Sequence, residues 1–393
     1  MEEDSSSLLY AVLAILTSFL FLVSSRLRAR SSQILAIYRD KKNLRDLISN
    51  QQSTSTSTND TDTDTGTNIQ VSSLFVHPIK SLRPVSVPQC QLTHLGLKGD
   101  RTLMLVRPSI TSSSSNYRFL TQRQCPKLAT INVSLPTETG IIHISNADRT
   151  QSLTLDACTH AILTKPIRYQ AGLWDDQVHV VDMGDEASQF IQRILHDHDH
   201  DHDHDHDPNN DSSEVDDYSD VRLVAQLPTD NRRVDARYCP NSVKDVWGQV
   251  PKVSLTDGFP ILIASQESLD ELNKRLTEKG KDVIPMSRFR PNIVVEGLEK
   301  AFGEDEWKTI QIGDGPDAAV LHVVKGCPRC KQSCTDQLTG ERFEEPLETL
   351  REFRAMNGNA EDVYFAQNVV LQPSLRGGDH NHIQIRVDRK SVV

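Results

Sequence analysis

Three of the seven cysteines lie within eight residues, at Cys327, Cys330 and Cys334. They follow the apolar run 318–324, which predicts a strand that ends in an exposed turn with the sequence GCPRC. A sulfur at such a turn can bind a metal, exchange a disulfide or remain an unreactive thiol. The chemistry of these thiols therefore nearly decides the function.

Local spacing leaves four alternatives for the thiols. A structural zinc site needs four ligands, usually from two CxxC pairs, and the other four cysteines are scattered singly. A thioredoxin-like pair should open a helix, but the sequence KQSCTDQLTG after Cys330 is a poor helix former. The thiols can also be buried and incidental. The fourth alternative is a single thiolate that binds a soft or high-valent metal cofactor, for which sulfur is a suitable donor.

Basic residues beside tight turns form a second constellation. The sequence HPIKS brings Lys80 and Ser81 to the end of a predicted strand, and GLKGDR places Arg101 in another turn. Glycines beside such side chains let backbone N–H groups and cations approach a phosphate or a carboxylate together. One such loop is more often a solvated charge. Two of them, with the later FRPN sequence (289–292), favour a shared anionic ligand.

The overall charge limits the possible partners. The net charge of −11 argues against nucleic-acid binding by general electrostatics. Six of the aspartates lie in a tract of alternating His and Asp from His196 to Asp207, and without them the charge would be −5. Such a repeat is typical of a disordered insertion, although it can gather Ni, Cu or Zn loosely. An odd number of cysteines without regular spacing favours a reducing compartment.

The amino-terminal segment 1–30 predicts a membrane anchor. Its apolar stretch 8–23 is at the short end for a spanning helix. Acidic residues precede the stretch and Arg26, Arg28 and Arg30 follow it, which disfavours a cleaved signal peptide and puts the bulk of the chain on the cytosolic side. A short span with basic flanks suits thin membranes, such as the mitochondrial outer membrane or the endoplasmic reticulum.

The rest of the chain predicts two domains. Residues 31–68 are expected to form an amphipathic helix and a solvated linker, and 196–220 a disordered His/Asp-rich insertion between domains at 69–195 and 221–390. Alternating strands with few helices indicate an α+β, β-rich fold and not a doubly wound sheet. Expected strands are 73–76, 102–106, 129–133, 141–144, 153–155, 293–295, 369–371 and 383–387, and expected helices are 185–195, 266–278 and 346–355. Ordered chain is expected to resume at 221–224, and 260–264 is an apolar run.

Six motifs in one order carry a family resemblance. They are HPIKS, LGLKGDR, TDGFP followed by ILIAS, FRPNIVV, GCPRC, and DxxTG followed by EPLETL, spread over residues 70–375. Together they resemble the MOSC family, and within it the mitochondrial amidoxime-reducing components, which are membrane-anchored molybdenum enzymes. The resemblance implies a MOSC β-barrel domain packed against a smaller N-terminal β-barrel-like domain.

The resemblance also implies site residues. It implies a molybdenum cofactor whose metal is bound by Cys330, while Cys327 matches a cysteine that is not the ligand. The chain departs from the animal relatives at Gly258-Phe259, where they carry Thr-Ser, and at Cys334, a third thiol. The positions that the resemblance assigns to the cofactor pocket are Lys80, Ser81, Arg101, Asp257, Arg290, Asn292 and Arg329.

The activity implied by the resemblance is the reduction of N-hydroxylated compounds, namely amidoximes, hydroxylamines and N-oxides. Electrons would come from NADH through cytochrome b5 reductase and cytochrome b5. The sequence has no haem or flavin motif, so these partners would be separate chains on the same membrane surface. Two alternatives stay open: a cofactor-handling module like the MOSC region of molybdenum cofactor sulfurases, which normally follows a pyridoxal-phosphate domain, and a non-enzymatic, membrane-tethered metal or redox adaptor.

Overall fold

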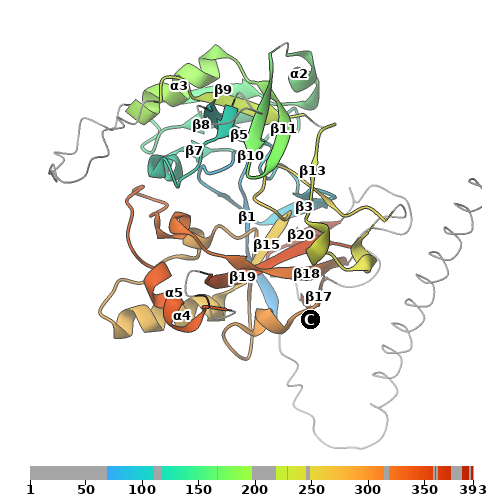
Figure 1. The fold of residues 1–393 in the computed structure, drawn as a ribbon, viewed down its shortest axis with the longest axis vertical. Helices are drawn as coiled ribbons and strands as arrows, with labels where there is room; N and C mark the ends of the chain where they lie inside the picture. Colours follow the sequence, from blue (N-terminus) through green and yellow to red (C-terminus); the bar gives the residue numbers. More distant parts are fainter. Residues whose placement is uncertain are drawn as a thin grey trace, which may run out of the picture. The chain divides into compact units, whose positions relative to one another are not determined.

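The computed structural model describes residues 69–392, except for 110–116, 166, 197–217, 228, 245–247, 314–317, 357–358, 360–361, 373–382 and 389–390 (Figure 1). The expected anchor, the linker to residue 68 and residues 197–217 of the expected His/Asp-rich insertion lie outside the described residues. At the two ends of that insertion (196–220), His196 is the last residue of a helix and Tyr218 is buried in an apolar core. Within the described part, no helix is long and apolar enough to cross a membrane. The described residues within 67–243 and 250–393 form one compact unit, to which every element below belongs.

The larger sheet of this unit has eight strands. They are β1 (Gln70–Val76), β2 (Val85–Val87), β15 (Ile261–Ser265), β16 (Ile293–Glu296), β17 (Thr309–Ile312), β18 (Ala319–Pro328), β19 (Tyr364–Leu371) and β21 (Ser391–Val392). Their order across the sheet is β2-β1-β16-β15-β19-β18-β17-β21. The neighbours β15 and β16 run parallel, so the chain between them needs a crossover.

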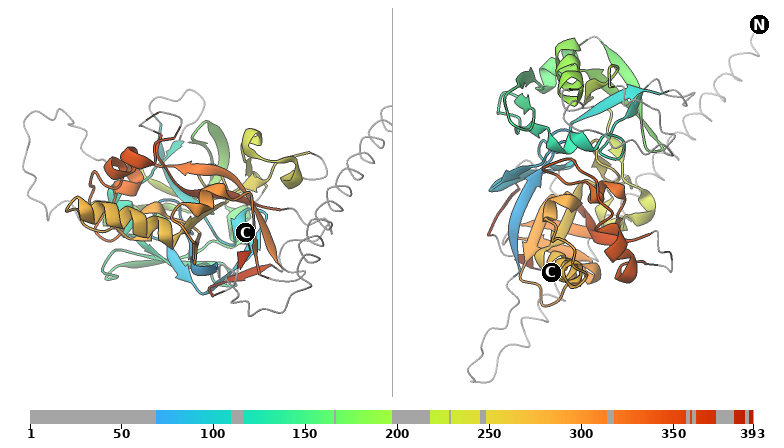
Figure 2. Two further views of the ribbon diagram at one scale, coloured as in Figure 1. Left: turned by 90° about the horizontal axis from the view of Figure 1, so that it is seen from below. Right: turned by 90° about the vertical axis from the view of Figure 1, so that its left-hand side faces the viewer.

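Helix α4 (Gln266–Glu278) makes that crossover and packs on the larger sheet. Its N-cap is Ser265, whose hydroxyl accepts a hydrogen bond from the Ser268 N–H at 3.2 Å. Helix α5 (Leu347–Phe353) lies beside it (Figures 1 and 2). Apolar residues three and four positions apart form one helix face. The buried face of α4 includes Leu269, Leu272 and Leu276.

The second large sheet is a closed five-stranded barrel. Its strands are β5 (Leu103–Pro108), β6 (Tyr117–Phe119), β10 (Arg168–Leu173), β11 (Asp176–Asp182) and β12 (Arg222–Gln226), in the order β10-β11-β12-β5-β6. Both faces of β5 are buried. Met104 and Val106 belong to one apolar cluster, whereas Leu103 and Leu105 belong to another. Because successive side chains of β5 point to opposite faces, this strand contributes to two apolar cores.

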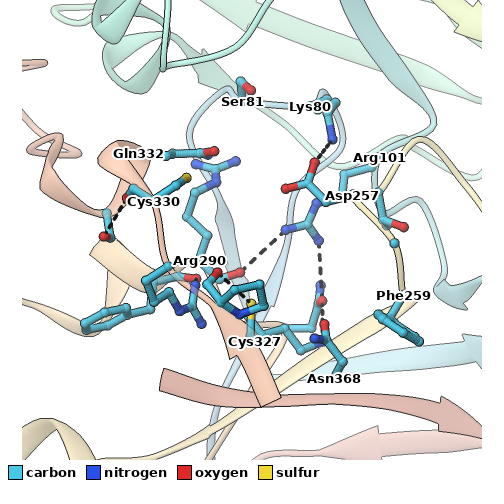
Figure 3. A pocket seen from close by; sticks show the side chains of 18 of the residues that line it. Lys80, Ser81, Arg101, Asp257, Phe259, Arg290, Cys327, Cys330, Gln332 and Asn368 are labelled. Atoms are coloured by element: carbon cyan, nitrogen blue, oxygen red, sulfur yellow. Dashed lines mark hydrogen bonds and ion pairs between the residues drawn. The ribbon is translucent and has the colours of Figure 1, made fainter. Parts of the chain in front are cut away.

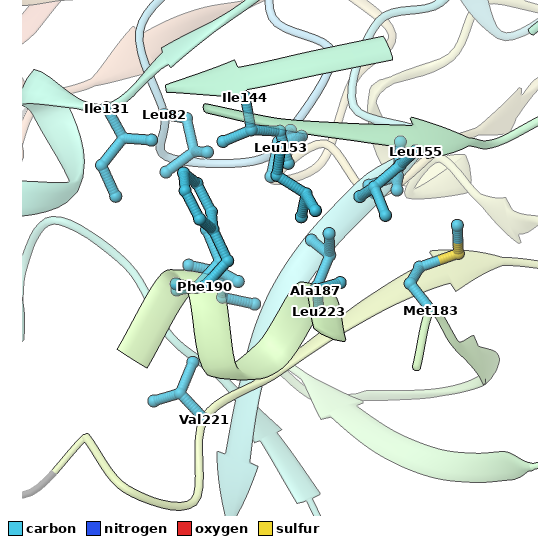
Figure 4. Packing of buried hydrophobic residues seen from close by; sticks show 14 of the residues in the cluster. Leu82, Ile131, Ile144, Leu153, Leu155, Met183, Ala187, Phe190, Val221 and Leu223 are labelled. Atoms are coloured by element: carbon cyan, nitrogen blue, oxygen red, sulfur yellow. The ribbon is translucent and has the colours of Figure 1, made fainter. Parts of the chain in front are cut away.

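The second of these cores lies under helix α3 (Asp185–His196). Phe190 and Ala187 of this helix pack against leucine and isoleucine side chains of the short strands (Figure 4). Acidic residues open α3 and Arg193 lies in its last turn, as the helix dipole favours. The short strands that pack against α3 belong to the set β7 (Asn132–Val133), β8 (Ile141–Ser145) and β9 (Ser152–Asp156). Helix α2 (Thr159–Thr164) and the 3-10 helix η1 (Pro126–Thr130) also contribute to this core.

Each of the two large sheets contains a strand from the other side of the domain boundary predicted from the sequence. Strand β12 follows the His-Asp tract, yet it pairs with β11 and β5 and closes the barrel. Conversely, β1 precedes the barrel strands but pairs with β16 in the larger sheet. The domain boundaries at 195 and 221 stay a prediction, but the strands of each sheet do not follow that linear division.

Several short strands form small sheets of their own. Strand β20 (Gln384–Arg386) pairs with β3 (Gln89–Thr93), which pairs with β4 (Gly96–Leu97). Strands β13 (Arg232–Arg233) and β14 (Lys252–Val253) form a pair of their own. The remaining 3-10 helices used below are η4 (Met286–Phe289), η5 (Gly303–Glu306) and η7 (Lys331–Cys334).

Most elements expected from the sequence are present. The helix predicted at 266–278 has those bounds, and α3 extends the predicted 185–195 by one residue. The strand predicted at 129–133 is wrong in its first part. There the chain forms η1, with Pro126 at its start and Leu128 buried, and β7 begins only at Asn132. The hairpin of β10 and β11 was not predicted.

Replacing Leu272 with alanine should lower the free energy of unfolding by about 2–5 kcal/mol, because the side chain is fully buried and its removal leaves a cavity. Urea unfolding followed by circular dichroism measures the change. The matched control is Lys274→Ala on the same helix, whose side chain is 66% exposed and should cost less than about 0.5 kcal/mol. Equal effects of the two substitutions would contradict the packing described for α4.

Candidate functional site

A pocket opens between the turn after β1, the loop after β6, the segment before β15, and η4 and η7 (Figure 3). Its lining is strongly cationic. The lining contains one carboxylate, Asp257, and six cations. The cations are Lys80, Arg101, Arg123, Arg288, Arg290 and Arg329. Such an excess of positive charge around one concave site predicts an anionic ligand.

Three of the sequence-predicted residues reach the pocket through unusual backbone geometry. Ser81, Arg101 and Arg290 have positive φ angles of 70°, 47° and 54°. Residues other than glycine adopt this left-handed region at a cost of order 1–3 kcal/mol, and they persist there when the surrounding contacts fix them. The Lys80 N–H donates to the Leu103 carbonyl at 2.8 Å, so β5 of the barrel fixes this turn.

Three cations of the pocket, Lys80, Arg288 and Arg290, are buried. Burial lowers the pKa of Lys80 to about 8, although the adjacent Asp257 carboxylate opposes this, and Lys80 Nζ also donates to the Leu255 carbonyl at 3.0 Å. Burial lowers the pKa of Arg290 to about 9, and the charge of Arg101 adds to that effect. A buried charge is costly unless it is paired, so these groups favour an anionic partner.

Asp257 is the counter-charge at the pocket opening. Burial would raise the pKa of this carboxyl group, but Lys80 and Arg123 lower it well below its usual range. The carboxylate contacts Lys80 Nζ, accepts the Trp174 indole N–H at 3.2 Å and lies 3.9 Å from Arg123 Nη2. Asp257 thus holds side chains from the barrel and from the turn after β1.

Asp100 and Asn292 form a buried brace behind the pocket. Asp100 Oδ1 accepts the His77 backbone N–H at 2.7 Å and the Asn292 amide at 3.1 Å, and its other oxygen pairs with Arg101. Asn292 also accepts the Leu262 N–H at 3.1 Å. The structure therefore brings Asn292 to the pocket as predicted, but its amide is engaged with the protein.

Arg329 has a similar bracing role. Its guanidinium donates from Nε to the Phe365 carbonyl at 2.9 Å and from Nη1 to the Phe289 carbonyl at 3.0 Å. It lies 5.1 Å from the ring of Phe289, which stacks on Phe365 at 3.8 Å. These contacts fix the turn that presents Cys330, so Arg329 lines the pocket while its charge faces backbone carbonyls.

The three clustered thiols differ in their hydrogen bonds. Cys327 donates weakly to the Pro328 carbonyl at 3.7 Å, and Cys334 donates to the Glu344 carbonyl at 3.2 Å. Burial raises the pKa of both thiols, which favours their neutral form. The sulfur of Cys330 instead accepts a hydrogen bond from Arg123 Nε at 3.1 Å. Cys330 is therefore the thiol of the three whose sulfur accepts a hydrogen bond from a cation of the pocket.

This geometry bears on the alternatives for the thiols. In the described part of the chain, no three His, Cys, Asp or Glu side chains gather where they could hold a metal ion. Cys330 precedes η7, a 3-10 helix of only four residues, whereas a thioredoxin-like pair should open a longer helix. The structure shows no disulfide bond among the described cysteines.

Two arginines of the pocket were missed by the sequence reasoning. Arg123 lies in the TQRQ segment after β6, which contains no glycine or other turn signal. Arg288 is only 6% exposed, and its Nε and Nη1 have no hydrogen-bond partner among the described residues. Its Nη2 donates to Asp336 at 3.0 Å. A buried guanidinium with unused donors adds to the anion-binding character of the pocket.

Comparison with known families agrees with the motifs. Residues 68–198 match the MOSC N-terminal beta barrel domain, and residues 250–380 match the MOSC domain. The chain therefore belongs to the family of MOSC proteins that carry this N-terminal barrel domain, and the α+β, β-rich fold expected from the sequence is confirmed.

Similar proteins of known name include the mitochondrial amidoxime-reducing components. The chain is 30% identical to component 1 of Danio rerio over 72% of its own length and 74% of the relative, and 28% identical to component 2 of Bos taurus over 75% of each. It is also 26% identical to a molybdenum cofactor sulfurase of Aspergillus terreus, over 78% of this chain and 39% of that protein. The resemblance drawn from the six motifs is thus confirmed.

Stability should fall in mild acid because His77 is buried. Burial lowers the pKa of His77 to about 3, with Arg101 and Arg290 adding to the effect. Above pH 6.5 His77 is neutral in both the folded and the unfolded chain. As pH falls from 6.5 towards 3, only the unfolded chain binds a proton at this histidine, so the free energy of unfolding falls. Between pH 7.5 and 5.5, His77 should account for a loss of about 1.4 kcal/mol.

Urea unfolding at these two pH values measures the loss. The variant His77→Gln should show a smaller pH dependence than the wild type, whatever its absolute stability. The control His143→Gln, at an exposed position, should keep the wild-type dependence. A His77→Gln variant with unchanged pH dependence would refute the assignment.

Proposed function

We propose that the pocket binds a molybdenum cofactor and that the protein uses it to reduce N-hydroxylated substrates, such as amidoximes, hydroxylamines and N-oxides. One observation carries the proposal. Six cations and one carboxylate line a pocket around Cys330, the thiol of three whose sulfur accepts a hydrogen bond from an arginine. An anionic ligand that also needs a thiolate donor fits this combination. The names of the similar proteins, which refer to amidoxime reduction and to the molybdenum cofactor, agree with it.

The residues fit the phosphate and pterin parts of such a cofactor. Lys80 and Arg290 are buried cations with lowered pKa values, so an anionic phosphate beside them would relieve the cost of their burial. Ser81 and Arg101 line the same side of the pocket and present their groups from left-handed turns. Arg288 has unused donors for further oxygens.

The sulfur of Cys330 fits the metal. Thiolate is a donor that soft and high-valent metals accept, and Cys330 is partly exposed at the pocket. When bound, the cofactor would supply the two-electron redox chemistry that removes oxygen from the substrate nitrogen. The chain itself would hold the cofactor through its cations, present the thiolate, and orient the substrate at the opening beside Asp257.

Partners and location extend the proposal. Electrons would arrive from NADH through cytochrome b5 reductase and cytochrome b5 as separate chains. The apolar segment 8–23, with arginines after it, would anchor the protein in a membrane. The mitochondrial outer membrane is the favoured site, because several similar proteins are named as mitochondrial, and the endoplasmic reticulum is the alternative.

Cofactor handling is a second candidate function. Sulfurases of Aspergillus terreus and Pyricularia oryzae match this chain over 78% and 77% of its length, about as much as the amidoxime-reducing components do. The same cationic pocket and thiol would serve a protein that binds the cofactor and transfers it or its sulfur. Turnover of a reducible substrate separates the two functions, since a handling module should bind the cofactor without it.

Replacing Cys330 with serine should abolish reduction, with a loss of more than about 100-fold, because a metal ligand should matter more than the outer-shell partners whose loss costs 10–100-fold. The assay is reduction of benzamidoxime by full-length protein with NADH, cytochrome b5 and its reductase, together with molybdenum and pterin content. Wild-type protein should hold about one molybdenum per chain.

The matched controls are Cys327→Ser and Cys334→Ser. Both thiols donate to backbone carbonyls, a contact that a serine hydroxyl can also make, so both variants should keep most of the activity. Full activity in Cys330→Ser would refute the ligand assignment. Wild-type protein that carries zinc or no metal would refute the proposed function as a whole.

A further inference from the structure

Arg123 is the residue of the barrel that touches the proposed metal ligand. Its Nε lies 3.1 Å from Cys330 Sγ, across 207 positions of sequence. We propose that Arg123 is a positioning residue for the Cys330 sulfur, so that the barrel completes a site whose thiol belongs to the larger sheet. This inference rests on the proposed function, because it assumes that Cys330 binds the metal.

The backbone of the Arg123 loop is fixed from two sides. The Gln122 side chain donates to the Ser81 carbonyl at 2.7 Å and exchanges hydrogen bonds with the amide of Gln337. Arg342 Nη2 donates to the Gln122 carbonyl at 2.6 Å. The loop therefore bonds to the turn that carries Lys80 and Ser81, and to the segment that follows Cys330.

The side chain of Arg123 is fixed as well. Its guanidinium carbon lies 4.5 Å from the ring of Trp174, and its Nη2 lies 3.9 Å from Asp257. Stacking on an aromatic face and a nearby carboxylate both favour one orientation of a guanidinium. With these two contacts in place, Nε is the donor that points to the sulfur.

Trp174 is itself held in a demanding conformation. It lies between β10 and β11 with a φ of 58°, a left-handed angle that is unfavourable for a bulky residue. Its indole N–H donates to Asp257, and its ring lies 5.1 Å from Phe119. Strained residues persist where their surroundings over-determine them, often at functional sites. The tip of this hairpin therefore serves as a fixed support for the guanidinium.

The chemical consequence concerns the sulfur. An N–H donor with a positive charge favours the thiolate and fixes the direction of its lone pairs. Hydrogen bonds from outer-shell groups to a metal ligand also change how much electron density the ligand gives to the metal. Arg123 would thus set both the orientation and the donor strength of Cys330. A second role, as one more cation for the cofactor phosphate, predicts different results.

The test compares Arg123→Gln and Arg123→Lys in the full chain. The control is Arg118→Gln, an exposed arginine in the middle of β6, the strand that precedes the Arg123 loop. The readouts are molybdenum and pterin content, the visible absorption of the bound metal centre, and kcat and KM for benzamidoxime. With Arg123→Gln we expect molybdenum content near wild type, a shifted sulfur-to-metal absorption, and kcat lower by about tenfold or more with KM changed less.

The other variants sharpen the comparison. Arg123→Lys keeps the charge but not the planar fork, so it should fall between Arg123→Gln and wild type. Trp174→Ala should shift absorption and kcat in the same direction as Arg123→Gln, and Trp174→Phe, which keeps an aromatic face, should lie closer to wild type. Arg118→Gln should match the wild type in every readout.

Two outcomes would overturn the inference. Unchanged absorption and kcat in Arg123→Gln would show that the contact with sulfur has no role. Loss of molybdenum from a variant that unfolds like the wild type would make Arg123 a cofactor anchor and not a positioning residue. Both outcomes differ from failure of the proposed function, in which the wild-type protein itself lacks molybdenum.

Discussion

Positive side chains that repel one another are held in a single pocket, and two carboxylates make this possible. Asp100, which is buried, pairs with Arg101, and Asp257 pairs with Lys80 at the pocket opening. The same carboxylates also accept hydrogen bonds from His77 and Trp174, so each ties a loop of the fold to a cation of the pocket. The same two carboxylates therefore both balance the charge of the cations and fix the positions of the loops. The pocket lining still holds six cations and only one carboxylate, and this excess of positive charge is the reason for expecting an anionic ligand.

The site depends on both sheets, although its residues are far apart in sequence. The larger sheet delivers the thiol through β18 and the turn that Arg329 braces. The barrel delivers Arg123 through the loop after β6 and Trp174 through the hairpin of β10 and β11. Lys80 lies between them, since its turn follows β1 of the larger sheet and bonds to β5 of the barrel. Neither sheet presents the thiol together with its hydrogen-bond donor.

Local signals in the sequence predicted the elements better than the site. Helix α4 could be predicted at its true bounds because a capping serine precedes leucines at helical spacing. The hairpin of β10 and β11 could not, because its turn contains Trp174 in a conformation that usually calls for glycine. Arg123 was missed for a related reason, since its partner Cys330 is 207 residues away and no spacing rule connects them. The cofactor positions came from the family resemblance, and the structure gathers them around one pocket.

The exchanged strands also limit how this protein can be rearranged in evolution. Strand β12 closes the barrel from beyond the His-Asp tract, and β1 enters the larger sheet from before the barrel. Splitting the gene between the two predicted domains would leave both the barrel and the larger sheet with an unpaired strand edge. The exposed backbone N–H and C=O groups of such an edge can pair with another chain and cause aggregation. The barrel and the larger sheet should therefore be inherited together, and fused to other domains only as one unit. The match to a sulfurase agrees, because it covers 78% of this chain within only 39% of that longer protein.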